Sequence, residues 1–285
     1  MTTPISTEVI QKKWDRFSSV FQFYNEPQTL PVCHILLSNL RLNLRSLTPP
    51  KAILEVACGA GAGSSLALSM KHDSTSLTSV DLSNEMVELT KKRTGVAVDK
   101  DGDESRKFKV LQVDAEKLPF ADSTFDRYFA NYCLHLVADP VQTLKETLRV
   151  LEKGGIACFS VWGRPQNSNQ FTITKSIAES IGVPNFPHSE RSAFHLNDID
   201  HLRKMVLDAG FSSCLGGYTY NNALILNGKE YVEVFFSGPD FQDYFKSLPI
   251  DIQQEWVSKV ESHVDELLQS GKMVGLETAY VVCVK

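Results

Sequence analysis

The sequence predicts an α/β fold built on a doubly wound, seven-stranded and mostly parallel sheet whose last strand is antiparallel. The first observation is that strand-like and helical runs alternate from Lys51 onward, which implies βαβ crossovers between parallel strands. The second is that two more strand-like runs, 211–220 and 276–285, close the chain. We expect these two runs to pair with each other in antiparallel fashion at the sheet edge.

Two helices are predicted before the sheet begins. Residues 6–24 carry apolar side chains at helical spacing, and Ser6 or Thr7 is placed to cap this helix. A second helix is expected over about 29–46, and the prolines at 49 and 50 end it.

The alternating region contains five predicted strands with helices between them. The strands are expected at 53–57, 76–81, 106–114, 125–134 and 156–162. The pair Asp139–Pro140 predicts the start of the helix before the fifth strand, and the pair Gly154–Gly155 is expected to end it. Asn197 is expected to cap a later helix that stops at Gly210.

Three aromatic-rich segments lie outside this alternation. In an open α/β sheet, ligands bind beyond the carboxyl ends of the strands, so we expect these segments to form a helical lid there. The chain, residues 1–285, is then one domain. Its core is predicted at about 50–163, 197–227 and 276–285, and its lid at about 1–48, 164–196 and 229–274.

Composition excludes several classes of partner. The net charge is −5 and no block of lysine and arginine occurs, so neither nucleic acid nor an anionic membrane surface is the expected partner. No apolar run approaches the roughly 18 residues of a membrane span, and residues 1–14 do not resemble a signal peptide. The six cysteines are scattered singly, which predicts reduced, buried thiols, no metal site and a cytoplasmic location.

The strand at 53–57 runs into a glycine-rich loop, "ILEVACGAGAG". Such a loop before a helix offers free backbone N–H groups to a ligand. The dinucleotide pattern G-x-G-x-x-G requires glycine at 64 or 66, where the sequence has Ser64 and Leu66. A nicotinamide-dependent oxidoreductase is therefore disfavoured.

Acidic residues mark the ends of neighbouring strands. Asp81 ends the second strand 22 residues after Gly59, where a carboxylate can accept both hydroxyl protons of a ribose. Asp114 ends the third strand, where it can meet an adenine amino group. Glu55 lies inside an apolar strand, which is costly unless the carboxylate is paired.

In this order, the motifs resemble the class I S-adenosylmethionine-dependent methyltransferases. The resemblance is greatest to the ubiquinone and menaquinone biosynthesis group, the type 11 methyltransferases. The matching stretches, which span roughly 50–162, are "ILEVACGAGAG", "VDLSNEM", "VDAEKLPFADSTFD", "NYCLHLVADP" and "LRVLEKGGIACFSVW". Weaker matches follow in "LDAGF" and "AYVVCVK". The resemblance implies a Rossmann-like fold and S-adenosylmethionine as the cofactor.

The resemblance also implies a role for each matching residue. Asp81 would hold the ribose hydroxyls, and Leu82 and Met86 would enclose the adenine. Asp114 and Ala115 would contact the adenine edge. The methionine part would be held by Glu55, Ala57, Gly59, Ala60, Gly61 and Asn131. The chain departs from the family's usual residues at Ala57 and Cys58, although Ala57 is small enough to fit.

Methyl transfer from a sulfonium is an in-line displacement that needs mainly proximity and alignment. A general base is needed only when the acceptor must lose a proton, and His135, just beyond the fourth strand, is the candidate. His188 is a weaker one. Tyr24, Trp162 and His195 are the candidate substrate contacts.

The aromatic lid predicts a small apolar or aromatic acceptor. Its identity, its reacting atom and the oligomeric state stay open at this stage. Two alternatives remain: a non-catalytic regulatory subunit that binds S-adenosylmethionine, and a protein methyltransferase. An asparagine-proline-proline-aromatic motif after the fourth strand would favour the second, but the sequence there is Asn131-Tyr132-Cys133-Leu134.

Overall fold

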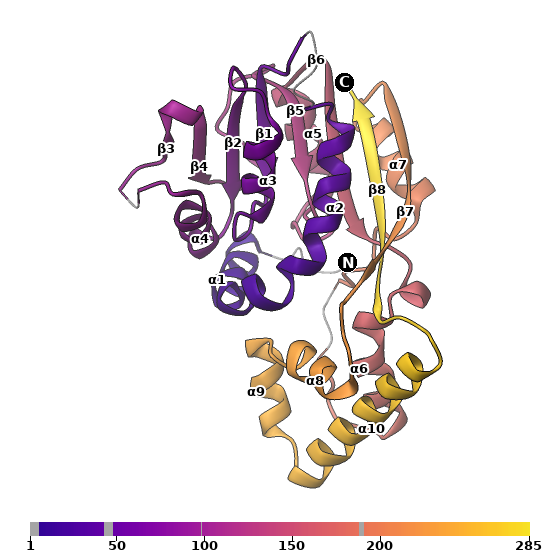
Figure 1. Cartoon of the computed structure of the whole chain (residues 1–285). Helices are drawn as coiled ribbons and strands as arrows, with labels where there is room; N and C mark the ends of the chain where they lie inside the picture. Colours follow the sequence, from indigo (N-terminus) through magenta and orange to yellow (C-terminus); the bar gives the residue numbers. More distant parts are fainter. Residues whose placement is uncertain (1–5, 43–47, 98, 188–190) are drawn as a thin grey trace.

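The computed structural model describes residues 6–42, 48–97, 99–187 and 191–285. Within these residues the chain forms an eight-stranded sheet with the order β3-β4-β2-β1-β5-β6-β8-β7 (Figure 1). The strands are β1 (Ala52–Val56), β2 (Ser76–Asp81), β3 (Gly102–Asp103), β4 (Phe108–Gln112), β5 (Phe125–Ala130), β6 (Leu151–Trp162), β7 (Ser213–Asn222) and β8 (Gly275–Val284).

The sheet confirms the predicted class and adds one strand. β1 pairs in parallel with β2 and β5, β2 pairs with β4, and β5 pairs with β6. β8 is antiparallel to both β6 and β7, so the last strand lies inside the sheet and β7 forms its edge. The eighth strand, β3, is a two-residue antiparallel addition to β4.

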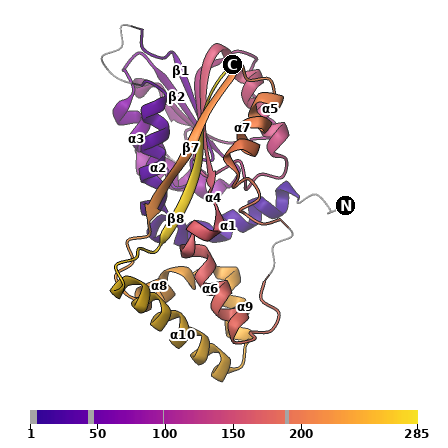
Figure 2. The ribbon, with the colours of Figure 1, turned by 90° about the vertical axis from the view of Figure 1, so that its right-hand side faces the viewer.

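Helices cover both faces of the sheet (Figure 2). One face is covered by α2, α3 and α4, and the other by α5 and α7. The helices are α1 (Thr7–Tyr24), α2 (Glu26–Asn39), α3 (Ala62–Met70), α4 (Asn84–Thr94), α5 (Pro140–Val150), α6 (Asn169–Ser180), α7 (Ile199–Asp208), α8 (Gly228–Phe235), α9 (Pro239–Ser247) and α10 (Ile250–Gln269).

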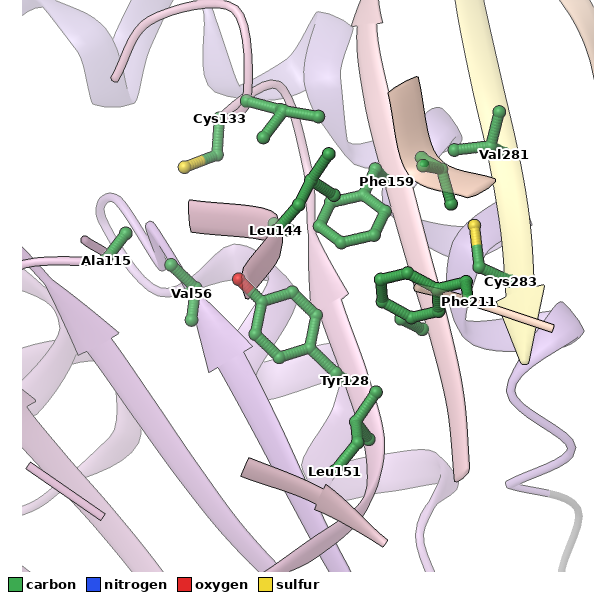
Figure 3. Packing of buried hydrophobic residues seen from close by; sticks show 14 of the residues in the cluster. Val56, Ala115, Tyr128, Cys133, Leu144, Leu151, Phe159, Phe211, Val281 and Cys283 are labelled. Carbon is green, nitrogen blue, oxygen red and sulfur yellow. The ribbon is translucent and has the colours of Figure 1, made fainter. Parts of the chain in front are cut away.

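The core on the α5–α7 face is built around two rings at the centre of the sheet (Figure 3). Tyr128 of β5 and Phe159 of β6 are fully buried, with ring centroids 5.4 Å apart. Leu144 of α5 and Phe211, which precedes β7, pack in the same cluster. Burying a large apolar side chain stabilises a fold by roughly 1.5–3 kcal/mol, so these contacts hold the strand ends that carry the site.

The predicted boundaries of three helices differ from the structure. α5 begins after Asp139 as predicted but ends at Val150, and the pair Gly154–Gly155 lies in β6. Gly154 has φ +79°, and the register of β6 against β5 shifts nearby, so this pair belongs to a bulge rather than a helix end. The cap of α7 is Asp198, not Asn197, because its carboxylate accepts the N–H of His201. α2 begins at Glu26 and ends at Asn39, earlier than predicted.

The predicted lid segments occupy different positions in the fold. α1 lies beside the carboxyl ends of the strands, but α2 packs along the face of the sheet, where Leu36, Leu37 and Leu40 are fully buried. In the predicted lid segment at about 229–274, Gly238 and Pro239 separate α8 from α9.

A second hydrophobic cluster joins α6, α8, α9 and α10 at one end of the molecule (Figures 1 and 2). Its centre is Trp256 of α10, which is fully buried and packs against Phe236, Phe241 and Phe245 at centroid distances of 5.3 to 5.8 Å. Many of the aromatic residues that predicted a lid therefore form the core of this helical cluster.

Two further predictions concern the whole chain. All six cysteines are free and buried, as the scattered pattern predicts. Among the described residues, no helix has both the length and the apolar character required to cross a bilayer.

We predict that Trp256→Ala lowers the free energy of unfolding by about 3–5 kcal/mol, because it leaves a cavity in the centre of the helical cluster. The control is Ile250→Ala in the same helix, where the side chain is 66% exposed and a change within about 0.5 kcal/mol is expected. Urea unfolding followed by circular dichroism measures both. Equal effects of the two substitutions would contradict the assignment of Trp256 as the centre of this cluster.

Candidate cofactor and acceptor site

A cavity of about 420 Å³ lies at the carboxyl ends of β1, β2, β4, β5 and β6. Ten of the eleven predicted cofactor-binding residues line it, together with Trp162. The ten are Glu55, Ala57, Gly59, Ala60, Asp81, Leu82, Met86, Asp114, Ala115 and Asn131. The volume is in the range of small-molecule sites.

The loop after β1 turns sharply through left-handed conformations. Ala57, Gly59 and Gly61 have φ values of +59°, +55° and +83°. This alternation directs the N–H of Gly59 to the Asp81 carboxylate at 2.9 Å. Phe21 of α1 lies over the loop, 3.2 Å from the place where a Cβ on Gly59 would stand, so α1 covers the glycine turn.

The other two glycines are required by packing. A Cβ on Gly61 would lie 2.9 Å from the Thr90 backbone of α4, and Gly61 does not line the cavity. A Cβ on Gly63 would lie 2.5 Å from the Glu55 carboxylate and 3.0 Å from the Cys33 sulfur. The structure thus explains the spacing G-x-G-x-G: only Gly59 and Gly63 reach the cavity, and Gly61 allows α4 to approach.

Glu55 is a buried carboxylate held by two hydroxyl groups. One of its oxygens accepts hydrogen bonds from Ser64 of α3 and Ser79 of β2, both at 2.5 Å. Burial raises the pKa of Glu55 to about 7, although the two hydroxyl groups lower it. This pairing supports the expectation that a carboxylate inside the strand has partners.

Asp81 ends β2 with both oxygens in use. Besides the N–H of Gly59, its carboxylate accepts the N–H of Ser83 at 2.9 Å. The Ser83 hydroxyl donates to Asp15 of α1 at 2.5 Å, which ties the covering helix to this strand end. Burial raises the pKa of Asp81 to about 6, and the charge of Asp15 adds to the shift.

Residues at the end of β4 and at the start of α4 line the part of the cavity next to Asp81. Met86 is buried at the start of α4, where its N–H donates to the Ser83 hydroxyl at 3.2 Å. Asp114 follows β4 and accepts the N–H of Glu116 at 2.9 Å. Leu82 and Ala115 line the cavity between these residues.

Asn131, at the end of β5, connects the sheet to α2. Its amide donates to the Thr29 carbonyl at 3.1 Å and accepts the Ser160 hydroxyl at 2.8 Å. The same Ser160 oxygen accepts the N–H of Tyr132, whose φ of +53° turns the chain there. These bonds hold the Asn131 side chain at the cavity wall.

An aromatic wall forms the far side. Trp162 of β6 stacks on Phe171 of α6 with centroids 4.1 Å apart and an interplanar angle of 13°. Phe194 packs against Trp162 at 5.0 Å. Both Trp162 and Phe171 line the cavity.

Sequence reasoning missed the polar members of this wall. Gln28 of α2, Gln170 of α6 and Asn221 of β7 are buried and line the cavity. They come from elements far apart in the chain, and none belongs to a motif. No signal in the sequence points to them.

Two of the predicted histidines, His135 and His195, do not line the cavity. His135 is 1% exposed, and neither of its ring nitrogens has a hydrogen-bond partner among the described residues. Burial lowers the pKa of His135 to about 3, which makes it a poor proton acceptor. His195 is hydrogen-bonded to the His135 carbonyl at 3.0 Å and is not a lining residue. His188 and the side chain of Tyr24 lie outside what the structure describes.

The core of the chain is similar to known methyltransferases. Residues 54–159 match the family model described as a methyltransferase domain. The chain is 29% identical over 150 residues to the ubiquinone/menaquinone biosynthesis C-methyltransferase UbiE of Geotalea daltonii, covering 52% of this chain and 60% of that protein. It is also 29% identical over 213 residues to a demethylmenaquinone methyltransferase of Staphylococcus aureus, covering 71% of this chain and 81% of that one.

The chain spans 37% to 60% of the length of three curated relatives that it matches. A solved structure, phosphoethanolamine N-methyltransferase 2 of Haemonchus contortus with S-adenosylhomocysteine, superposes with a TM-score of 0.58. This superposition covers 99% of this chain and 61% of that one, at 14% identity, so it shows a shared fold. Together these findings confirm the resemblance predicted from the ordered motifs.

We predict that Gly63→Ala lowers the free energy of unfolding by about 1–3 kcal/mol, because the added methyl group would overlap the buried Glu55 carboxylate. The matched control is Gly217→Ala, where the nearest atom to the new Cβ is the Tyr280 hydroxyl at 4.0 Å. Chemical denaturation measures both. If the two variants were equally stable, Gly63 would not be needed for packing against Glu55.

Proposed function

We propose that this class I S-adenosylmethionine-dependent methyltransferase, close to the ubiquinone/menaquinone-biosynthesis group, transfers the methyl group to a small, uncharged and largely apolar acceptor. One observation carries the proposal. A single cavity extends across the point between the parallel strands β1 and β5 where the order of strands in the sheet reverses. Acidic residues line the part by β1, β2 and β4, whereas aromatic and amide side chains line the part by β5 and β6.

The acidic half fits the cofactor. Glu55 and Asp81 are buried carboxyls with raised pKa values and no cationic side chain bonded to them among the described residues. A ligand that carries positive charge and ribose hydroxyls would supply the missing partners. When bound, S-adenosylmethionine supplies a methyl group on a positively charged sulfur, which an acceptor takes by in-line displacement.

We assign roles to the residues around the cofactor as follows. Asp81 accepts the ribose hydroxyls, and Leu82 and Met86 enclose the adenine. Asp114 and Ala115 meet the adenine edge. The methionine part lies against Glu55, Ala57, Gly59, Ala60 and Asn131, and Gly61 contributes by letting α4 approach the loop.

The acceptor half is arranged to position a molecule and keep water away from it. Trp162 and Phe171 provide a flat apolar surface. The described lining residues contributed by β5 to β8, α6 and the connection after β6 include no histidine, carboxylate or lysine, and the carboxylate that α2 adds, Glu26, is ion-paired with Arg93 of α4. Burial raises the pKa of the Tyr132 hydroxyl far above its ordinary value, so it does not act as a base. We propose that transfer proceeds without a side-chain base, by proximity and alignment. The six buried thiols favour a reducing compartment such as the cytoplasm.

The test is a search for methylated products. Purified protein with isotope-labelled S-adenosylmethionine is incubated with a metabolite extract, and labelled small molecules are separated and identified. The proposal expects at least one labelled product together with S-adenosylhomocysteine. A protein that binds the cofactor but labels nothing would be a regulatory subunit, and label on protein alone would favour the protein methyltransferase.

Asp81→Asn is expected to weaken cofactor binding about ten- to hundredfold, because it removes a charged hydrogen-bond acceptor. The control, Asp200→Asn, changes a carboxylate that is 85% exposed on α7 and should bind normally. The rise in melting temperature with S-adenosylhomocysteine measures both. An unchanged rise for Asp81→Asn would remove Asp81 from the site.

Cofactor binding is expected to strengthen as the pH rises from 5.5 to 7.5. Because the folded-state pKa values of Asp81 and Glu55 are raised to about 6 and about 7, both carboxyls stabilise the ligand-free protein at low pH and this contribution is lost as the pH rises through those values. A cationic ligand prefers the ionised forms, so S-adenosylmethionine should raise the melting temperature more at pH 7.5 than at pH 5.5. The double variant Glu55→Gln, Asp81→Asn should lose this dependence. A pH-independent rise in the unsubstituted protein would contradict the linkage.

A further inference from the structure

Four side chains form a polar strip in the acceptor half of the cavity. The strip consists of Gln28 (α2), Tyr132 (after β5), Gln170 (α6) and Asn221 (β7), all of which line the cavity. Gln28, Gln170 and Asn221 are 9%, 2% and 7% exposed, so their hydrogen bonds must be made within the protein or to a ligand.

Each amide nitrogen of the strip donates at least one hydrogen bond. Asn221 donates to the Tyr132 hydroxyl at 2.8 Å and to the Gln28 carbonyl at 3.1 Å. Tyr132 shares its hydroxyl with Thr278 of β8. The Gln170 amide nitrogen donates to Gln28 Oε1 at 2.5 Å, and the Gln28 amide nitrogen reaches the Ala223 carbonyl at 3.5 Å.

In the structure, the Gln170 amide turns its nitrogen toward Gln28 Oε1, while the Gln28 nitrogen reaches the Ala223 carbonyl in a long contact of 3.5 Å. The Gln170 Oε1 atom is then left buried with no hydrogen-bond partner among the described residues. A buried acceptor without a partner costs about 1–3 kcal/mol.

Charge and shape around the strip restrict what can supply the missing donor. The Trp162–Phe171 stack forms the adjoining wall, and Gln170 directly precedes Phe171 on α6. A charged ligand group here would be buried among amides and aromatic rings, and Glu26, the carboxylate nearest to Gln28 in the sequence, is already ion-paired with Arg93, so burying that charge is costly. A neutral O–H or N–H group can donate a hydrogen bond to Gln170 Oε1 without the cost of burying a charge.

We infer that Gln170 is a specificity residue that accepts a hydrogen bond from a neutral hydroxyl or N–H group of the methyl acceptor. The apolar body of the acceptor lies against Trp162 and Phe171. This inference rests on the proposed function, since it names the class of acceptor for the same site: an uncharged apolar or aromatic molecule with at least one O–H or N–H donor.

The experiment measures binding of two matched pairs of neutral probes by calorimetry, in the presence of saturating S-adenosylhomocysteine. The pairs are 2-naphthol with 2-methoxynaphthalene, and indole with 1-methylindole. In each pair the second compound keeps the rings and lacks the donor. The donor-bearing member is expected to bind about tenfold more tightly, in keeping with one hydrogen bond to a buried acceptor.

Gln170→Leu should abolish the preference within each pair, and Gln170→Met, which is unbranched, serves as a second variant. The control Phe171→Leu reduces the aromatic wall and should weaken both members of a pair by the same factor. The rise in melting temperature with S-adenosylhomocysteine shows that each variant is folded with its cofactor half intact.

Three results would overturn the inference: no preference in the unsubstituted protein, a preference that survives both Gln170 variants, or no binding of any probe. The first would mean that a water molecule satisfies Gln170. Failure of the proposed function is separate, because it would appear as no rise in melting temperature with S-adenosylhomocysteine in the unsubstituted protein.

Discussion

The burial of one carboxylate, that of Glu55, is the constraint on which the site depends. Ionised or not, a carboxyl group in the middle of a sheet needs hydrogen-bond donors, and Ser64 of α3 and Ser79 of β2 provide them. These bonds tie β1 to its neighbouring strand and to the helix that follows it. They also require glycine at 63, because any larger residue would overlap the carboxylate. Packing against the Glu55 carboxylate thus accounts for one glycine of the turn without reference to a ligand.

The reversal of strand order between the parallel strands β1 and β5 separates two chemically different parts of the cavity. On one side, strand ends present Glu55, Asp81 and Asp114 in surroundings that raise the pKa of the first two. On the other side, the ends of β5 and β6 meet α6 and β7, which contribute rings and amides. α1 lies over the first side through Phe21 and Asp15. One edge of the sheet therefore brings a part of the cavity lined by carboxylates next to a part lined by aromatic rings and amides.

Prediction succeeded where the signal is local in sequence. A buried strand followed by glycine or aspartate can be recognised within ten residues, and parallel strands bring such ends to the same edge of the sheet. That is why Asp81 and Asp114 could be placed at strand ends that meet at the cavity, and why the seven principal strands were predicted in order. It failed where a residue acts through distant neighbours. His135 follows a strand in a promising position, but the packing of Trp162 and the segment containing His195 encloses it. The sequence also did not predict that Phe186, Phe235 and Phe236, from two of the aromatic-rich segments, pack together with Trp256 in one helical cluster.

By itself, the sequence determined the fold class, the family resemblance and the identity of the cofactor, because these depend on periodicity and on short motifs with a set spacing. Only the tertiary structure decided what lies opposite the cofactor. Gln28 and Gln170 lie more than a hundred residues apart in the sequence, and Gln170 and Asn221 lie about fifty apart. No sequence pattern connects the three. They become one hydrogen-bonded strip because α2, α6 and β7 converge beside the carboxyl ends of the central strands. Side chains from such separate elements meet only when the whole core has packed.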